Sequence, residues 1–131
     1  FLACGRGIEG GRVEERLVSS GLDLLPTWCD YAGVEPPEEL EGRSLRPILE
    51  GRDVEWREYV PIECEIGYGV GTNNYEYALY DGGENREQLY DFERDPYQTR
   101  NWLNEPGMDE VIQRHRELMR QQWPNLSVPG A

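Results

Sequence analysis

The chain has 131 residues, 26 of them acidic and 13 basic, and its formal net charge is -13 at pH 7. Every basic residue is an arginine. A surface this acidic repels phosphate backbones, so we expect no nucleic-acid partner. No apolar run approaches the roughly 20 residues of a membrane helix, so we expect no membrane partner, and there is no targeting signal. The start at Phe1, without a methionine, suggests a processed chain or a fragment.

The cysteines Cys4, Cys29 and Cys64 are widely spaced and form no CxxC pair. Because His115 is the only histidine, a zinc site of standard composition is excluded and the cysteines are expected to be free thiols. The acidic loop over residues 34–42 lacks the ligand spacing and the central glycine of an EF-hand. We therefore expect no metal site in this chain.

The first part of the chain, residues 1–51, is expected to hold a strand end at residues 1–4, a glycine-rich turn, a helix and a proline-rich loop. The helix is predicted from a cap at Ser20 to Ala32, with Gly33 as its stop. Apolar residues occupy so much of its circumference that it needs cover on more than one side. A chain this short does not supply that cover. These residues are Leu22, Leu24, Leu25, Trp28, Cys29, Tyr31 and Ala32.

The second part, residues 52–131, has the pattern of a small sheet and a helix. Apolar residues alternate over 60–66, which predicts a half-buried strand with Ile62 and Cys64 on its inner face. Residues 67–74 are expected to form a flexible loop, and residues 75–80 and 89–92 an antiparallel hairpin. Apolar residues at helical spacing over 108–123 predict an amphipathic helix on the sheet. The fold class is therefore α+β, a small antiparallel sheet packed by a C-terminal amphipathic helix.

The aromatic residues of these strands have two interpretations. Tyr75 and Tyr77 point the same way and could stack on a sugar ring, although tyrosines in strands more often pack within the sheet. Tyr90 and Phe92 are expected to pack against the final helix. His115 lies beside the apolar stripe of that helix and is expected to be a packing residue. Asp95 and Pro96 are expected to set a turn.

Two stretches resemble the sulfatases of the alkaline-phosphatase superfamily. The run VSSGLDLLPTWCDYAGVEPPEELEGRSLRPILEG is similar to their vDl-x-PT-l-x-x-aG segment followed by P-x-x-l-x-G-x-SL-x-p-l-l-x-G. The run EYALYDGGENREQLYDFERDPYQTRNW is similar to their KY-i-x-Y, eLYDL and DP-x-E-x-x-N run. Their order and spacing make the combined resemblance specific. It implies that the chain is the C-terminal portion of a formylglycine-dependent (type I) sulfatase.

The resemblance also implies a domain organisation and a division of labour. Residues 1–51 would be the last strand and helix of the large α/β domain, and residues 52–131 the small C-terminal subdomain. The family uses calcium and a formylglycine made from the cysteine of a C-x-P-S-R motif. That motif is absent here, so the resemblance assigns no catalytic and no metal-binding residue to this chain. The chain alone is expected to be inactive, whereas its parent would hydrolyse sulfuric esters.

The loop over 67–74 is expected to border the substrate cleft of the parent, with Tyr68, Asn73, Asn74 and Tyr75 as the candidate residues. The expected partners are the rest of the large domain and, for the parent, a sulfated small molecule or glycan. The isolated chain is expected to self-associate through its uncovered helix. Gly71 and Glu76 stand where the family tends to have an arginine and a lysine, which puts contact between this loop and an anionic substrate in doubt.

Two other functions stay open. The chain could be a free-standing glycan- or protein-binding module, or the tail of a phosphate or phosphonate ester hydrolase of the same superfamily. A C-x-P-S-R motif upstream would indicate a sulfatase, and a threonine or serine nucleophile a phosphatase. For a sulfatase parent we expect a periplasmic, extracellular or lysosomal location.

Overall fold

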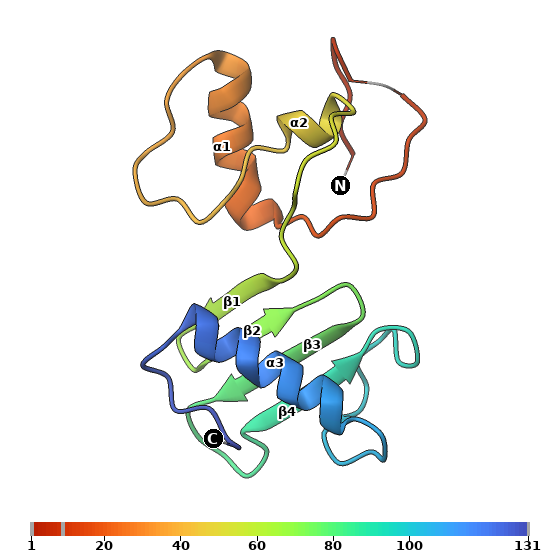
Figure 1. The fold of residues 1–131 in the computed structure, drawn as a ribbon, viewed down its shortest axis with the longest axis vertical. Coiled ribbons are helices and arrows are strands. Elements are labelled where there is room, and N and C mark those ends of the chain that lie inside the picture. Colours follow the sequence, from red (N-terminus) through yellow and green to blue (C-terminus); the bar gives the residue numbers. More distant parts are fainter. Residues whose placement is uncertain (1, 9, 131) are drawn as a thin grey trace. The chain divides into compact units, whose positions relative to one another are not determined.

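A computed structural model describes residues 2–8 and 10–130, and the chain divides into two compact units, Phe1–Arg57 and Glu58–Ala131 (Figure 1). The predicted assignment of residues 1–51 to a large domain and of 52–131 to a small subdomain stays a prediction. Each unit is described by itself below.

The first unit contains helices α1 (Ser20–Ala32) and α2 (Arg46–Leu49). Ser19 is the N-cap of α1, one residue before the predicted cap, and its hydroxyl accepts a hydrogen bond from the backbone N–H of Leu22 at 3.4 Å. Gly33 ends the helix with a left-handed φ of 67°. The strand expected over residues 1–4 is absent from residues 2–4, which are irregular, and Phe1 lies outside the described residues.

Helix α1 buries its polar face. Its buried residues are Asp23, Pro26 and Thr27. The apolar residues Leu25, Trp28 and Tyr31 are 43%, 63% and 40% exposed. The rest of the first unit therefore packs on the polar side of α1 and leaves much of its apolar side exposed. This agrees with the expectation from the sequence that the chain does not cover this helix on every side.

The buried carboxylate of Asp23 ties α1 to the rest of the unit. Arg57 donates to both carboxylate oxygens, at 2.9 and 2.5 Å, and the two side chains are 7% and 0% exposed. The backbone N–H groups of Ser19 and Arg43 donate to the same carboxylate at 2.8 and 2.9 Å. Thr27 adds a fourth connection, because its hydroxyl accepts from the N–H of Leu45 at 2.8 Å.

The segment that faces Asp23 passes so close to α1 that one position must be glycine. A Cβ added at Gly42 would lie 1.8 Å from the carbonyl oxygen of Leu22. The resemblance motifs that contain Asp23, Thr27 and Gly42 are therefore explained by the packing of one turn of helix against one loop.

The second unit is a four-stranded antiparallel sheet in the order β1-β2-β3-β4, with helix α3 across one face (Figure 1). The strands are β1 (Val60–Cys64), β2 (Gly67–Gly71), β3 (Tyr75–Tyr80) and β4 (Glu87–Asp91), and α3 spans Asp109–Gln122. The predicted fold class, α+β with an antiparallel sheet and a C-terminal helix, is confirmed.

Residues 67–71 form a strand, so the prediction of a flexible loop over all of 67–74 was wrong. The strand could not be recognised from the sequence because three of its residues are glycines, Gly67, Gly69 and Gly71. Without side chains, they cannot show the alternation of apolar and polar residues that indicates a strand. Their role is to permit close approach of the neighbouring strand. A Cβ at Gly67 would lie 2.6 Å from the carbonyl oxygen of Leu79 in β3.

The core lies between α3 and the sheet face that carries alternate residues of β2, β3 and β4. Its fully buried members include Val70, Tyr77, Leu89 and Met119. Because Leu89 faces the helix, Tyr90 lies on the other face, and the prediction that Tyr90 packs against α3 was wrong. Phe92 lies in the turn after β4 and outside this core.

The inner face predicted for β1 was also wrong. Pro61 and Glu63 pair with Val70 and Tyr68, whose side chains lie on the α3 side of the sheet. Ile62 and Cys64 therefore occupy the opposite face, where Ile62 is 40% exposed and Cys64 is exposed. The alternation fixed which residues share a face, but only the position of α3 decides which face is covered.

The stretch after β4 covers the outer edge of that strand. The side-chain oxygen of Asn101 accepts from the N–H of Leu89 at 3.0 Å, and the N–H of Trp102 donates to the carbonyl of Leu89 at 2.8 Å. Asp95 holds the preceding turn by accepting from the hydroxyl of Thr99 and the N–H of Arg100, both at 3.0 Å. An edge strand with its backbone groups satisfied does not offer a template for aggregation.

Replacing Asp23 by asparagine should destabilise the first unit by about 3–5 kcal/mol, because the Arg57 guanidinium would stay buried without a counter-charge. Hydrogen exchange of the α1 backbone amides measures the loss. Asp53→Asn is the matched control, since Asp53 is exposed and its ion pair with Arg16 spans 3.7 Å, and it should cost about 0–1 kcal/mol. Equal effects of the two variants would contradict a central role for Asp23.

Gly67→Ala should lower the free energy of unfolding of the second unit by about 1–3 kcal/mol, because the new methyl group meets backbone atoms that side-chain motion cannot clear. Urea denaturation followed by tryptophan fluorescence measures the change, in a background where Trp28 and Trp56 of the first unit are replaced by phenylalanine so that Trp102 and Trp123 report on the second unit. Gly82→Ala, where nothing lies within 4 Å of the added Cβ, should stay within about 0.5 kcal/mol of the wild type. An unchanged midpoint for Gly67→Ala would refute the close approach.

Candidate functional site

The four candidate cleft residues lie in β2, in the turn over residues 72–74 and at the start of β3. Tyr68 packs edge-on against Trp123, with ring centroids 5.1 Å apart, and Tyr75 packs edge-on against His115 at 5.8 Å. Both rings are therefore held beneath α3. For Tyr75 this geometry favours the sheet-packing interpretation over stacking on a sugar.

Asn73 and Asn74 are the accessible members of the set. Both are exposed in the β2–β3 turn. The backbone carbonyl of Asn74 accepts from the N–H of Phe92 at 2.9 Å, which ties the turn to the end of β4. Neither side-chain amide is hydrogen-bonded to another residue in the described part of the chain. The turn thus presents two uncommitted amides on a fixed backbone.

His115 connects this turn to α3. Its side chain is 3% exposed, and Nδ1 lies 2.7 Å from the carbonyl oxygen of Val111. Because a carbonyl oxygen only accepts, we assign the proton of the neutral ring to Nδ1. Nε2 then carries no hydrogen and accepts from the hydroxyl of Thr72 at 3.2 Å, and the same Thr72 oxygen accepts from the N–H of Tyr75 at 3.2 Å. The predicted packing role of His115 is consistent with this burial.

The charge near the turn comes from Glu76. Its side chain lies on the sheet face away from α3, since its neighbours in β3, Tyr75 and Tyr77, face the helix. Burial raises the pKa of the Glu76 carboxyl, and no cation among the described residues forms an ion pair with it. The turn is therefore flanked by a carboxyl group and by Gly71, neither of which attracts an anion.

The other buried carboxylates have structural partners. Asp91 accepts from the N–H groups of Glu93 and Arg94, both at 3.0 Å. Hydrogen bonds from the backbone of Thr99 and Arg100 hold the pKa of the Asp95 carboxyl below its usual range. Both carboxyl groups are committed to hydrogen bonds within their own turns, so they are poor candidates for proton transfer.

No group of three or more histidine, cysteine, aspartate or glutamate side chains within residues 2–8 and 10–130 is placed to hold a metal ion. Cys4 and Cys64 are exposed and Cys29 is half-buried, all as free thiols. Within the same residues no helix is long and apolar enough to cross a membrane.

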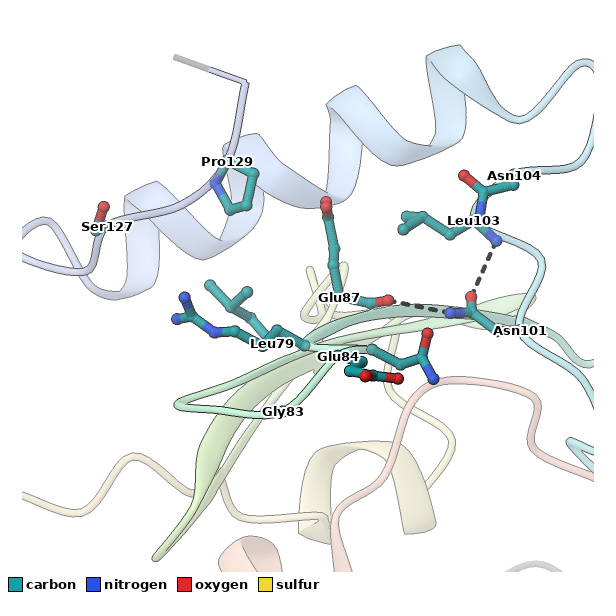
Figure 2. A pocket seen from close by; sticks show the side chains of 11 residues that line it. Leu79, Gly83, Glu84, Glu87, Asn101, Leu103, Asn104, Ser127 and Pro129 are labelled. Carbon is teal, nitrogen blue, oxygen red and sulfur yellow. Dashed lines mark hydrogen bonds between the residues drawn. The ribbon is translucent and has the colours of Figure 1, made fainter.

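The sequence did not predict a cavity of about 570 Å³ at the far end of the sheet from the β2–β3 turn (Figure 2). The cavity lies between the β3–β4 turn, the segment over 101–104 and the C-terminal tail. Its wall mixes apolar and polar groups, among them Leu79, Glu84, Arg86, Asn101, Asn104 and Ser127. The only sequence signal for it is the concentration of amide and acidic residues in two turns.

Comparison with known proteins gives one consistent result. The family model described as N-sulphoglucosamine sulphohydrolase, C-terminal, matches residues 2–124. A Delta 4,5-hexuronate-2-O-sulfatase of Bacteroides thetaiotaomicron is 34% identical over 130 residues, which cover 91% of this chain and 27% of that protein. A solved 2-O GAG sulfatase superposes with a TM-score of 0.76 at 32% identity, over 97% of this chain and 31% of the other.

The fold is shared more widely. A solved phosphonate monoester hydrolase of Silicibacter pomeroyi superposes with a TM-score of 0.62 at 23% identity, over 79% of this chain and 25% of the other. At this identity only the fold is shown to be common. The chain thus spans between a quarter and a third of the length of the proteins that it matches here.

The unfolding free energy should decrease as the pH falls below about 6.5, in part through His115. Burial lowers the pKa of the His115 imidazole, an effect that nearby Arg114 strengthens and Glu58 and the Val111 carbonyl weaken. Thr72, Tyr75 and Tyr77 also face the ring. The unfolded chain therefore binds the proton first, and stability rises with pH through this range.

Chemical denaturation at pH 5 and pH 7 tests this, with His115→Phe as the comparison. The carboxylates titrate in both proteins, so the difference between the two pH dependences isolates the histidine. The wild type should lose more stability than the variant on acidification. Parallel curves would show that His115 titrates alike in the folded and unfolded states.

Proposed function

The chain belongs to the N-sulphoglucosamine sulphohydrolase C-terminal family of sulfatases, and from that premise we propose that it serves a longer protein that hydrolyses sulfuric esters of glycans. The match over residues 2–124 is the observation that carries the proposal. The ester linkage is proposed because the 2-O-sulfatase relatives named above are O-sulfatases. The relatives are three to four times as long, so the activity is that of the whole protein.

The 131 residues contribute structure to that activity, and the catalytic groups lie outside them. A sulfatase of this type would use calcium and a formylglycine, and the residues present do not fit either group. None of the three cysteines stands in a C-x-P-S-R motif, and the described residues offer no cluster of metal ligands. We therefore assign no chemical step to this chain.

The exposed apolar side of α1 indicates that the first unit has a partner that covers it. Leu25, Trp28 and Tyr31 form an exposed apolar surface on a helix whose polar side is already buried. Exposed aromatic and leucine side chains on one helix face are typical of a surface that another element covers. The proposed cover is the remainder of the large sulfatase domain, and the isolated chain would instead self-associate. The proposed location of the whole protein is periplasmic, extracellular or lysosomal.

Asn73 and Asn74 are the proposed contacts of this chain with the substrate cleft. Their amides are exposed and have no hydrogen-bonding partner among the described residues, whereas Tyr68 and Tyr75 hold the turn through α3. Amides donate and accept hydrogen bonds without net charge, so they suit sugar hydroxyls beside a sulfate group. Glu76 and Gly71 give this turn no cation, so recognition of the sulfate itself is left to residues elsewhere.

A second candidate function is the hydrolysis of phosphate or phosphonate esters, which the fold of the Silicibacter pomeroyi enzyme supports. A free-standing glycan- or protein-binding module is a third. The coding sequence upstream of Phe1 separates the three: a C-x-P-S-R motif indicates a sulfatase, a threonine or serine nucleophile a phosphatase, and a start codon near Phe1 a module.

An arylsulfate assay tests the division of labour. The 131-residue chain should release no product above buffer, whereas the longer protein should turn over. In the longer protein, replacing both Asn73 and Asn74 by alanine should raise KM for a sulfated oligosaccharide by at most about tenfold for each hydrogen bond that is lost. The change in kcat should be smaller. Asn125→Ala, an exposed amide after α3, is the matched control. Turnover by the short chain, or faster hydrolysis of a phosphonate ester, would overturn the proposal.

A further inference from the structure

We propose that the cavity at the β3–β4 end of the sheet binds an uncharged sugar unit. The strand register places it away from the turn that carries Asn73, because Tyr75 pairs with Asp91 at one end of β3 and Leu79 with Glu87 at the other. Its volume of about 570 Å³ falls in the roughly 300–1,000 Å³ range of small-molecule sites.

The floor of the cavity is rigid. Asn101 makes three hydrogen bonds through its amide, with its oxygen accepting from the N–H groups of Leu89 and Leu103 and its nitrogen donating to the carbonyl of Glu87, each at 3.0 Å (Figure 2). The Glu87 carboxylate accepts from Nε of Arg116 at 2.7 Å and from the hydroxyl of Tyr77. A ligand would meet this floor without having to order it first.

The tail that closes one side is also fastened. Arg120 of α3 donates to the carbonyl of Pro129 at 2.9 Å, and Val128 is buried in the core. Ser127 and Pro129 therefore line the cavity from a fixed segment and lie beside α3 in the close-up (Figure 2).

The rim carries polar side chains with nothing to bind inside the protein. Within the described residues, the side chains of Glu84, Asn85, Asn104 and Ser127 make no hydrogen bond to the protein. Arg86 commits only Nε, which donates to the carbonyl of Tyr80 at 2.9 Å. The rim thus offers two amides, a hydroxyl, a carboxylate and part of a guanidinium around apolar walls from Leu79, Leu103 and Pro129.

This combination matches a sugar better than an ion. Each sugar hydroxyl donates and accepts a hydrogen bond, and amides and hydroxyls do the same. Leu79 and Leu103 provide apolar surface for the C–H groups of a ring. The charges balance in number, since Glu84 and Glu87 are acidic and Arg86 and Arg116 basic, and Arg116 forms an ion pair with Glu87. A neutral cavity in an acidic chain does not concentrate sulfate.

A cation is disfavoured by the same contacts. The Oε1 atom of Glu87 is occupied by Arg116 and Tyr77, and the Asn101 oxygen by two backbone N–H groups. Calcium sites rely on several carboxylate ligands, and the described residues hold no group of three or more histidine, cysteine, aspartate or glutamate side chains placed to hold a metal ion. The inference goes beyond the proposed hydrolysis, because it concerns the binding of an unsulfated unit and holds whichever ester the longer protein cleaves.

Titration of the 15N-labelled chain with N-acetylglucosamine, followed by NMR, tests the inference. Saturable shifts are expected at the backbone amides of residues 83–87, 101–104 and 127–128. Because the ligand is neutral, the apparent Kd should not change with added salt. Asn104→Ala should raise the Kd about tenfold, the equivalent of one hydrogen bond. Asn125→Ala makes the same chemical change at an exposed position outside the lining and should leave the Kd unchanged.

A parallel titration with N-acetylglucosamine 6-sulfate defines the failure. If the sulfated sugar shifts the same amides with a Kd more than tenfold lower, the cavity is an anion site and the inference is wrong. It is also wrong if the neutral sugar gives no saturable shift at the lining, or if Asn104→Ala and Asn125→Ala bind alike. None of these results bears on ester hydrolysis, which the arylsulfate assay measures separately.

Discussion

The first unit depends on one buried ion pair. A carboxylate removed from water is costly unless its oxygens are fully hydrogen-bonded. Asp23 meets that condition with four N–H donors, two from the Arg57 guanidinium and one each from the backbones of Ser19 and Arg43. These donors come from the start of α1, the loop after it and the end of the unit. The planar fork of arginine suits a bidentate contact that lysine could not make, in a chain that has no lysine.

The second unit is also held by a shielded carboxylate that pairs with an arginine, in this case Glu87. Glu87 joins Tyr77 of β3 and Arg116 of α3, so it links the helix to the sheet at the edge of the apolar core. Burial, together with the hydrogen bond to Glu87, raises the pKa of the Tyr77 hydroxyl and keeps it a donor. Arg116 and Glu87 are each 15% exposed, so this pair is shielded from solvent far more than the surface pairs. In both units the resemblance motifs lie where a polar contact fixes the packing.

The sequence predicted the elements whose periodicity is carried by side chains. The apolar stripe of α3 and the hairpin around residues 75–92 have that property, and both are present. Strand β2 does not, because three of its five residues are glycine. The polar side of α1 was not predicted to be buried, since the partners that bury Asp23 lie 20 and 34 residues away. The exposed positions of Asn73 and Asn74 followed from their turn, whereas the packing of Tyr68 and Tyr75 depended on α3.

The cavity escaped prediction for a related reason. Apart from Leu79 of β3 and Glu87 of β4, its residues come from three irregular segments, and each segment alone looks like an ordinary turn. They differ from ordinary turns in the polar side chains that stay without a hydrogen-bonding partner among the described residues after the backbone groups have been paired. The Asn101 amide makes two hydrogen bonds to the edge of β4 and a third to Leu103, whereas the Asn104 amide, three residues later, makes none within the described residues. A sequence shows two asparagines, and only the hydrogen bonds show that one is structural and the other is free to bind. The same distinction applies at the other end of the sheet. Tyr75 packs against His115 and holds the turn in place, whereas the side chain of its neighbour Asn74 is exposed and available for binding.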